Sequence, residues 1–539
     1  MSFQQPRQCD VLIIGGGLSG LTAAYQIIKR CPDLSVIVLE AKNRLGGRTL
    51  TLSLRSSNGT DVWDFGAQWI GLTQLEILRV IKDLSIETYS QFASGRKVAQ
   101  LCSPQHYTYT SDLPTSSPLR IFRFLRMMWK IDRLSKKYSM FDPFATPGAQ
   151  DYDEMSVAAM IRNGTGGDQL LMELQECVNR TLYGTSMAKV SALYMLMCGS
   201  VCGSYSDTVG VKDNGVQAYK LKGGTQQISA KIAERLQSAG SNVTILLDHP
   251  VAKVVQYGGN AEGSSGSFVE ITTKSGEIFR SNRVICAMAP SQANAITFDP
   301  PLPVHKRELL ANFPMGNMIK FIVTYQRPFW RENGYSGEIV ARGHSEQESA
   351  RPTPVCATFD ATSPDGSPAL VGFIHLEWSE ASPEERRDAV LKDLGRYLGK
   401  QALDCIDYMD KDWSAEPYSG GCPISALPTG FSQVFVDSIR NPTGNIHWAG
   451  TETATRWPGY MSGAVQSGER VAMEVLHCLK PELVKSSELN GTIYASNYKK
   501  PATVKFSDSR GCCNRMALIM SCASIAICVV CTIVYSWKF

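Results

Sequence analysis

The sequence lacks a strong excess of charge of either sign. Its 54 Lys and Arg residues nearly balance 50 Asp and Glu residues, which leaves a formal net charge of +4 over 539 residues. It also lacks a basic tract and an RNA-binding signature. We therefore expect no nucleic-acid partner, and charge by itself does not select a function.

Metal-ligand spacing is absent as well. The 16 cysteines are scattered without the spacing that metal sites show beside histidines, and the only CxxC pair, Cys528 and Cys531, lies in an apolar segment. The stretch Met1 to Gln8 is polar, which is not typical of a secretory signal peptide. We expect no metal, and mostly free thiols in a reducing compartment.

Apolar residues and glycine are plentiful. With 43% apolar residues over this length, the chain can bury a large core in more than one domain. Residues Val11–Ile14 predict a short buried strand, the following GGGLSG predicts a tight turn that opens a helix, and Ser35–Leu39 predicts a second strand ending at Glu40. This order predicts a βαβ dinucleotide-binding unit.

Three glycines of the turn have mechanical roles in such a unit. Gly15 permits the turn, Gly17 lets the backbone approach a pyrophosphate at the helix N-terminus, and Gly20 lets helix and strand pack closely. Glu40 follows Gly20 by twenty residues, where a carboxylate can accept hydrogen bonds from both ribose hydroxyls. We therefore expect no 2′-phosphate on the ribose. A lone glycine motif is weak, but strand, helix, second strand and acid in register are much stronger.

A second glycine turn, NRLGGRT, follows Glu40 and carries Arg48, which can meet a diphosphate. This arrangement resembles the FAD-binding signature of the flavin amine oxidase superfamily. Two later motifs are more specific: SGGC, which ends at Cys422, and AGTETATRWPGYMSGAVQSGER, which begins at Ala449. With them the chain resembles the monoamine oxidases from Cys9 to its C-terminal apolar segment.

The resemblance implies FAD rather than NAD as cofactor, joined covalently through the sulfur of Cys422 to the flavin 8α-methyl group. A small core thiol is the alternative for Cys422. It further implies three catalytic positions, Lys320, Tyr460 and Gln217, with Lys320 holding a water against the flavin. The cofactor-binding positions that it implies are Gly15, Gly17, Ser19, Gly20, Glu40, Lys42, Arg48, Gly66, Ala67, Gln68, Trp69, Val251, Trp413, Cys422, Gly450, Glu452, Gly459, Tyr460 and Met461. Among these, Glu452 would accept hydrogen bonds from cofactor hydroxyls.

One departure from the family concerns the aromatic cage around the amine. Tyr460 matches one cage tyrosine, but the other should directly follow the flavin-bound cysteine, and that position is Pro423. A proline offers no π-face to an amine, so another aromatic reaches in or the substrate differs. Arg180 lies where the family has apolar cavity walls, and it could bind a substrate carboxylate or be structural.

The expected fold class is α/β, with an FAD-binding Rossmann-like domain, a mixed α+β substrate domain and a C-terminal transmembrane helix. The predicted FAD-binding domain comprises residues 1–90, 223–297 and 411–465, and the substrate domain comprises 91–222 and 298–410. Residues 466–515 would form a C-terminal helix and linker. The segment from about 74 to 210 reads as mainly helical, and Pro383–Leu398 as a further helix.

Residues 516–537 are 22 residues without a charge, and as a helix they would span about 33 Å, enough for a bilayer core. We expect a tail anchor in the mitochondrial outer membrane with the body in the cytosol; the endoplasmic reticulum is the alternative. Another segment that could contact a membrane runs from Ile121 to Lys137 and mixes aromatic and basic residues. A solvated helix face and a membrane contact both fit that pattern.

The expected reaction is oxidative deamination of a primary monoamine to an aldehyde, ammonia and hydrogen peroxide with O2. The expected partners are a small amine, O2 and a membrane, and a homodimer is a further hypothesis. Pro423 and Arg180 leave open a flavin oxidase of the same fold that acts on amino acids or polyamines. A membrane-tethered flavoprotein scaffold without turnover is the alternative from another class.

Overall fold

The computed structural model describes residues 5–208, 215–238, 242–258, 267–343 and 351–495. The chain divides into two units, 1–499 and 500–539, and every described residue belongs to the first. The predicted anchor, 516–537, lies outside the described residues. Within the described ranges, no helix is both long and apolar enough to cross a bilayer.

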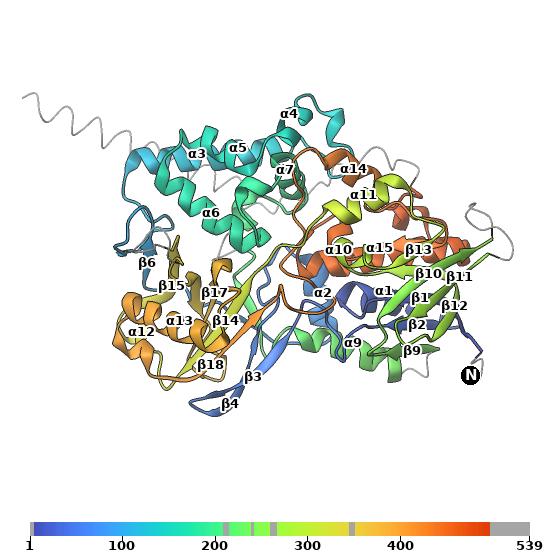
Figure 1. The fold of residues 1–539 in the computed structure, drawn as a ribbon, viewed down its shortest axis with the longest axis horizontal. Coiled ribbons are helices and arrows are strands. Elements are labelled where there is room, and N and C mark those ends of the chain that lie inside the picture. The colour runs from blue at the N-terminus through green and yellow to red at the C-terminus, as the bar shows by residue number, and fades with distance from the viewer. Residues whose placement is uncertain (1–4, 209–214, 239–241, 259–266, 344–350, 496–539) are drawn as a thin grey trace, which may run out of the picture. The chain divides into compact units, whose positions relative to one another are not determined.

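An eight-stranded sheet forms one half of the first unit (Figure 1). Its path is β13-β10-β11-β12-β1-β2-β9, and β19 pairs with β12. The bounds are β1 Arg7–Ile14, β2 Val36–Leu39, β9 Val243–Leu246, β10 Val251–Tyr257, β11 Phe268–Thr273, β12 Ile278–Cys286, β13 Thr297–Asp299 and β19 Ile446–Trp448. Three separated parts of the sequence therefore meet in one sheet, while the domain boundaries given above stay a prediction.

The centre of this sheet is parallel and buried on both faces. β1 pairs in parallel with β12 and β2, so that Val11 lies opposite Arg283 on one side and Val36 on the other. The fully apolar run at the end of β1 fits such a position, since helices cover a parallel sheet. β11 and β12 form an antiparallel hairpin whose turn contains Gly276.

Four helices contribute to the core of this half: α1 Leu18–Arg30, α2 Leu75–Asp83, α9 Gln226–Ser238 and α15 Met461–Leu479. α1 and α15 pack closely because their contact uses small residues. A Cβ on Gly468 would lie 2.4 Å from the Ser19 carbonyl oxygen, and the Ser19 and Ser467 hydroxyls are 2.8 Å apart. The motif that begins at Ala449 therefore packs directly against the first glycine turn.

A seven-stranded sheet, in the order β18-β14-β17-β16-β15-β6-β7, forms the other half. Its strands are β6 Arg96–Gln100, β7 Tyr107–Tyr109, β14 Ile319–Tyr325, β15 Tyr335–Ala341, β16 Val355–Asp360, β17 Ala369–Ile374 and β18 Cys405–Asp412. The predicted helix Pro383–Leu398 is confirmed as α13, which begins with a capping box between Ser382 and Glu385.

Helices dominate residues 118–208, with α3 Pro118–Ser135, α4 Ala149–Glu154, α5 Val157–Thr165, α6 Gln169–Tyr183, α7 Ala192–Val201 and α8 Tyr205–Thr208. The mainly helical expectation for 74–210 misses β6, β7 and β5 Thr88–Ser90. These strands are only three to five residues long, and distant partners hold them: β5 pairs with β8 Tyr219–Leu221, and β6 with β15. Periodicity over so few residues is not readable.

The remaining helices and strands complete the connections. They are β3 Thr51–Ser56, β4 Gly59–Asp64, α10 Pro290–Ala293, α11 Val304–Asn312, α12 Phe329–Glu332 and α14 Ser432–Ser438.

Candidate functional site

A cavity of about 570 Å³ opens at the C-terminal ends of β1 and β2 and is also lined by residues of the seven-stranded sheet. Ligands of parallel α/β sheets bind at this edge. The predicted site residues that line it are Gly15, Gly17, Ser19, Glu40, Lys42, Arg48, Gly66, Ala67, Gln68, Trp69, Gln217, Val251, Lys320, Trp413, Cys422, Gly450, Gly459, Tyr460 and Met461. Gly20 and Glu452 do not line it.

In the first glycine turn, Gly15, Gly16 and Gly20 pack against neighbouring atoms and Gly17 stays open. A Cβ on Gly15 would lie 2.5 Å from the Ala287 carbonyl oxygen, and one on Gly20 would lie 2.1 Å from the Gly15 carbonyl oxygen. A Cβ on Gly17 would meet no atom within 4 Å. Gly17 therefore presents bare backbone to the cavity at the N-terminus of α1, which is the cradle that a pyrophosphate needs.

Glu40 is held in place by backbone donors at the end of β2. Its Oε2 accepts the Gly16 N–H at 2.7 Å and its Oε1 accepts the Lys42 N–H at 2.9 Å. The carboxylate is buried at the rim of the cavity. Since each carboxylate oxygen has a second lone pair, both remain able to accept a hydroxyl.

Lys42 binds the segment before SGGC. Its Nζ donates to Glu416 Oε1 at 2.7 Å and to Ser419 Oγ at 2.8 Å. Burial alone would raise the pKa of Glu416, but Lys411, Lys42 and Arg44 all contact its carboxylate and lower that pKa to about 2. Burial lowers the pKa of Lys42 despite this partner.

Arg48 is oriented by Glu452 rather than left free. Its Nη1 and Nη2 donate to Glu452 Oε1 and Oε2 at 2.7 and 3.0 Å, and Nη1 also donates to the Pro423 carbonyl oxygen at 2.9 Å. The Glu452 side chain is fully buried, and this bidentate ion pair with Arg48 compensates its buried charge. Arg48 reaches the cavity wall, whereas the Glu452 carboxylate faces Arg48.

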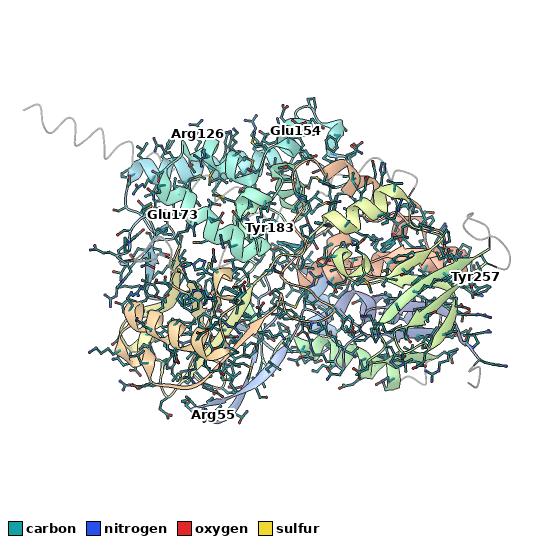
Figure 2. The ribbon with its side chains drawn as sticks, in the orientation of Figure 1. Arg55, Arg126, Glu154, Glu173, Tyr183 and Tyr257 are labelled. Atoms are coloured by element: carbon teal, nitrogen blue, oxygen red, sulfur yellow. The ribbon has the colours of Figure 1, made fainter. Side chains whose placement is uncertain are left out.

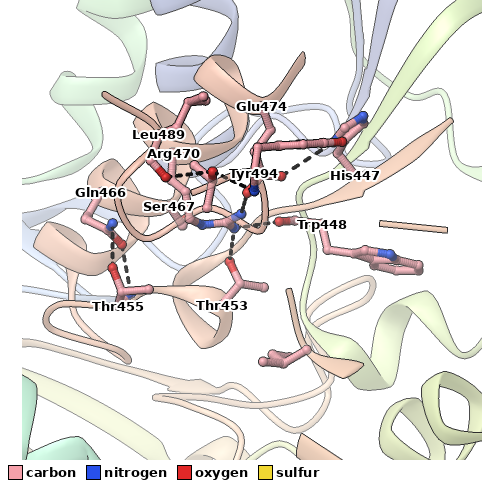
Figure 3. A network of polar contacts seen from close by, with 12 residues as sticks. His447, Trp448, Thr453, Thr455, Gln466, Ser467, Arg470, Glu474, Leu489 and Tyr494 are labelled. Atoms are coloured by element: carbon pink, nitrogen blue, oxygen red, sulfur yellow. Dashed lines mark hydrogen bonds and ion pairs between the residues drawn. The ribbon is translucent and has the colours of Figure 1, made fainter. Parts of the chain in front are cut away.

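A buried network behind the cavity holds the segment from Trp448 to Thr453 (Figure 3). Arg470 on α15 pairs with Glu474 and donates to the Trp448 carbonyl oxygen at 2.7 Å and to Thr453 Oγ1 at 2.9 Å. Burial would raise the pKa of Glu474, but Arg470 and then His447 lower it. The loop that brings Gly450 to the cavity is therefore fixed by charge-assisted hydrogen bonds.

Lys320, on β14 of the seven-stranded sheet, lines the cavity. Its Nζ donates to the Gly66 carbonyl oxygen at 2.9 Å and to Gln68 Oε1 at 2.8 Å. Burial lowers the pKa of Lys320 to about 7, against the opposing charge of Asp64. At neutral pH the Lys320 side chain is therefore present both as the protonated ammonium and as the neutral amine.

Cys422 lines the same central part of the cavity. Burial raises the pKa of its thiol to about 12, while Arg48 and Lys320 act in the opposite direction. The peptide bond from Cys422 to Pro423 is cis, and Pro423 also lines the cavity. Trp413, which opens the SGGC segment, donates its indole N–H to the Phe65 carbonyl oxygen at 2.9 Å.

We call one further part of the lining the helical end of the cavity. It is formed by Thr181, Leu182, Tyr183, Met195, Cys198, Gly199, Cys202, Tyr205, Thr208, Val216, Gln217, Ile424 and Tyr460. None of these described residues is charged. Sequence reasoning found only Gln217 and Tyr460 here. The one signal that it passed over is the i, i+4 pair formed by Cys198 on α7 and Cys202 at the C-cap of that helix.

Arg180 does not belong to the cavity. Its Nε donates to Glu176 at 2.9 Å, its Nη1 lies 3.7 Å from Glu377, and it is not among the lining residues. The possibility that Arg180 binds a substrate carboxylate is therefore wrong. The three residues that follow it at the C-terminal end of α6, Thr181 to Tyr183, line the cavity instead.

The fold and the site together define a dinucleotide-binding α/β protein with a cavity for a second small molecule. Residues 18–476 match the family described as flavin containing amine oxidoreductase. The chain belongs to this family and is an FAD-dependent amine oxidase.

Individual relatives agree with this membership. The probable flavin-containing monoamine oxidase A of Dictyostelium discoideum is 32% identical over 471 residues, covering 86% of this chain and 97% of the relative. The flavin-containing amine oxidase A of Equus caballus is 35% identical over 479 residues, covering 87% and 85%.

Solved structures are similar over the same range. Putrescine oxidase bound to putrescine superposes with a TM-score of 0.76 at 27% identity, covering 87% of this chain and 99% of the other. Cyclohexylamine oxidase from Brevibacterium oxydans gives a TM-score of 0.76 at 28% identity, covering 88% and 99%.

Proposed function

We propose that the enzyme oxidises apolar primary monoamines, R–CH2–NH2, with O2 and water to the aldehyde, ammonia and hydrogen peroxide. The observation that carries this proposal is the uncharged helical end of the cavity. A polyamine would need a carboxylate for its second ammonium group, and an amino acid would need a cation for its carboxylate. The described lining residues at this end offer neither.

The residues around the cavity fit FAD. Gly17 and the N-terminus of α1 would hold the diphosphate, Glu40 the adenosine ribose, and the backbone beside Gly66 the ring system. FAD, when bound, supplies the acceptor for the two electrons of the amine. Lys320 supplies a proton-bearing cation in the water-poor centre, where it would stabilise negative charge that develops on oxygen.

We further propose that the sulfur of Cys422 carries FAD covalently. Its position on the cavity wall supports this role, and the charges of Arg48 and Lys320 offset part of the rise in thiol pKa that burial causes. Acid precipitation of the wild type should leave the flavin in the protein pellet. The Cys422→Ser variant should release it to the supernatant, and retention by that variant would contradict the attachment.

Tyr183 is our candidate for the aromatic surface that Pro423 cannot supply. The chain at Tyr183 is packed directly against the SGGC segment: a Cβ on the next residue, Gly184, would lie 2.5 Å from the Cys422 carbonyl oxygen. Tyr183 itself ends α6 and lines the cavity, as does Tyr460 (Figure 2 labels Tyr183). The two tyrosines would hold the neutral amine by their ring faces.

Replacement of this ring tests the assignment. Tyr183→Leu should lower kcat/KM for an arylalkylamine about 3- to 30-fold, as expected for loss of one amine–π contact. Tyr194→Phe is the matched control, because Tyr194 is buried behind Tyr183 and does not line the cavity. If Tyr205→Leu lowers kcat/KM while Tyr183→Leu does not, Tyr205 is the cage residue instead.

The substrate class is tested by anaerobic titration of the flavin absorbance. Phenylethylamine, serotonin, a polyamine and an L-amino acid are added to separate samples of the purified enzyme. Bleaching by the arylalkylamines, with little response to the other two, is expected. Bleaching by the polyamine or the amino acid alone would overturn the monoamine proposal.

We also propose that residues 516–537 anchor the enzyme in the mitochondrial outer membrane with its catalytic body in the cytosol. The 22 uncharged residues, with Arg515 before them and Lys538 after them, support a tail anchor.

A further inference from the structure

The helix α3 carries an exposed apolar row. Its inner face is buried through Met127, Met128 and Ile131, which pack in the core of the helical region. On another face, four large apolar side chains are exposed: Leu119 by 56%, Phe122 by 62%, Leu125 by 44% and Trp129 by 54%. They follow one another at steps of three, three and four residues, so they form one continuous stripe.

Cations accompany this stripe. Arg126, Lys130 and Arg133 are exposed beside it, and the Arg133 guanidinium lies 5.3 Å from the centre of the Trp129 ring. Figure 2 shows Arg126 at the outer edge of the molecule. Among the described residues, no carboxylate forms an ion pair with Arg126 or Lys130. Arg120 and Arg123, by contrast, share Asp168 at 3.1 and 3.7 Å.

We propose that α3 lies on an anionic lipid bilayer, with Phe122, Leu125 and Trp129 among the upper acyl segments and the neighbouring cations at lipid phosphates. An exposed apolar row on a soluble surface is unfavourable unless something covers it. Aromatic and leucine side chains bordered by Arg and Lys are the chemistry of interfacial helices, and the positive border selects anionic lipid. A protein partner would not require the exposed cations Arg126, Lys130 and Arg133 beside the second half of the row.

This contact is separate from the proposed anchor and from catalysis. None of the exposed α3 residues lines the cavity. A contact that depends on charge and shallow burial adds to a transmembrane segment as a second membrane signal. The helix would then hold one face of the catalytic body against the membrane.

Fluorescence of Trp129 in the full chain tests the proposal. The wild type and Trp129→Phe are reconstituted into phosphatidylcholine vesicles with and without phosphatidylserine, made with or without bromine on the upper acyl carbons. In the anionic vesicles, the wild type should show a blue-shifted and bromine-quenched emission component that Trp129→Phe lacks. Equal quenching of the two proteins would overturn the proposal, whatever the anchor does.

A charge introduced into the row supplies a second measurement. Phe122→Glu should decrease the lipid-dependent quenching of Trp129 without loss of amine oxidation in detergent. Leu403→Glu is the matched control, because Leu403 is 51% exposed and lies outside α3. If Phe122→Glu instead converts a detergent-solubilised dimer to a monomer and leaves the quenching unchanged, the row is an interface between two copies and the membrane contact is wrong.

Discussion

Lys320 carries an ionisable group at a buried position from which water is largely excluded, and this burial sets its pKa. The ammonium donates to two neutral acceptors, the Gly66 carbonyl oxygen and Gln68 Oε1. Burial therefore lowers its pKa to about 7 from an ordinary value of 10.5. A group with this pKa loses its proton as the pH rises through neutrality.

The pH dependence of oxygen consumption follows from this residue. Because the protonated ammonium stabilises charge on oxygen, the rate at which the reduced enzyme consumes O2 should fall as pH rises through about 7. Lys320→Met should lower that rate about 100-fold and abolish the inflection. Stopped-flow reoxidation at a series of pH values measures both, and an unchanged inflection in the variant would contradict the assignment.

Stability provides the control for the same variant. Between pH 7 and 10.5 the unfolded chain binds a proton at Lys320 that the folded chain does not bind. The free energy of unfolding of the wild type should therefore rise with pH relative to Lys320→Met across this window. Denaturation of the two proteins at pH 6 and pH 9 tests the sign.

At the scale of elements, the turn between β1 and α1 separates two roles of glycine. A Cβ on Gly20 would lie 2.1 Å from the Gly15 carbonyl oxygen, so β1 and α1 would have to move apart. A Cβ on Gly17 would meet no protein atom, and its φ of −78° is ordinary for any residue. One position serves the fold and the other serves the ligand.

Alanine at each position should distinguish these roles. Gly20→Ala should lower the free energy of unfolding of the flavin-free protein by about 1–3 kcal/mol through overpacking. Gly17→Ala should leave that stability nearly unchanged and weaken FAD binding, because its methyl group would occupy the diphosphate cradle. Chemical denaturation and FAD titration measure the two effects, and equal destabilisation by both variants would contradict this view of the turn.

At the scale of the whole molecule, residues 1–499 form one compact unit that contains every described lining residue of the cavity. A chain that ends at residue 499 should therefore keep its amine oxidase activity. It should also change from an integral membrane protein, which resists extraction by high salt, to one that high salt releases, because only the charge-dependent contact of α3 would remain. Fractionation with salt and carbonate washes measures this. A truncated chain that still resists both washes would contradict the anchor.

Much of the nucleotide-binding half could be predicted because its information is local. Gly15, Gly17 and Glu40 lie within one continuous βαβ unit, so spacing alone places them around one cavity. Glu452 shows the limit of this reasoning. The motif marks the residue, but its carboxylate faces Arg48, which lies 404 residues away in the sequence.

The sequence by itself determined the family, the FAD-binding unit and the long uncharged segment, because each depends on the order of neighbouring residues. Only the tertiary structure decided that Arg180 pairs with Glu176 outside the cavity, that Tyr183 lies beside the Cys422 backbone, and that one row of α3 is exposed. These three facts depend on which distant segments pack together. Packing of that kind is set by the shapes and charges of whole elements rather than by any pattern along one of them.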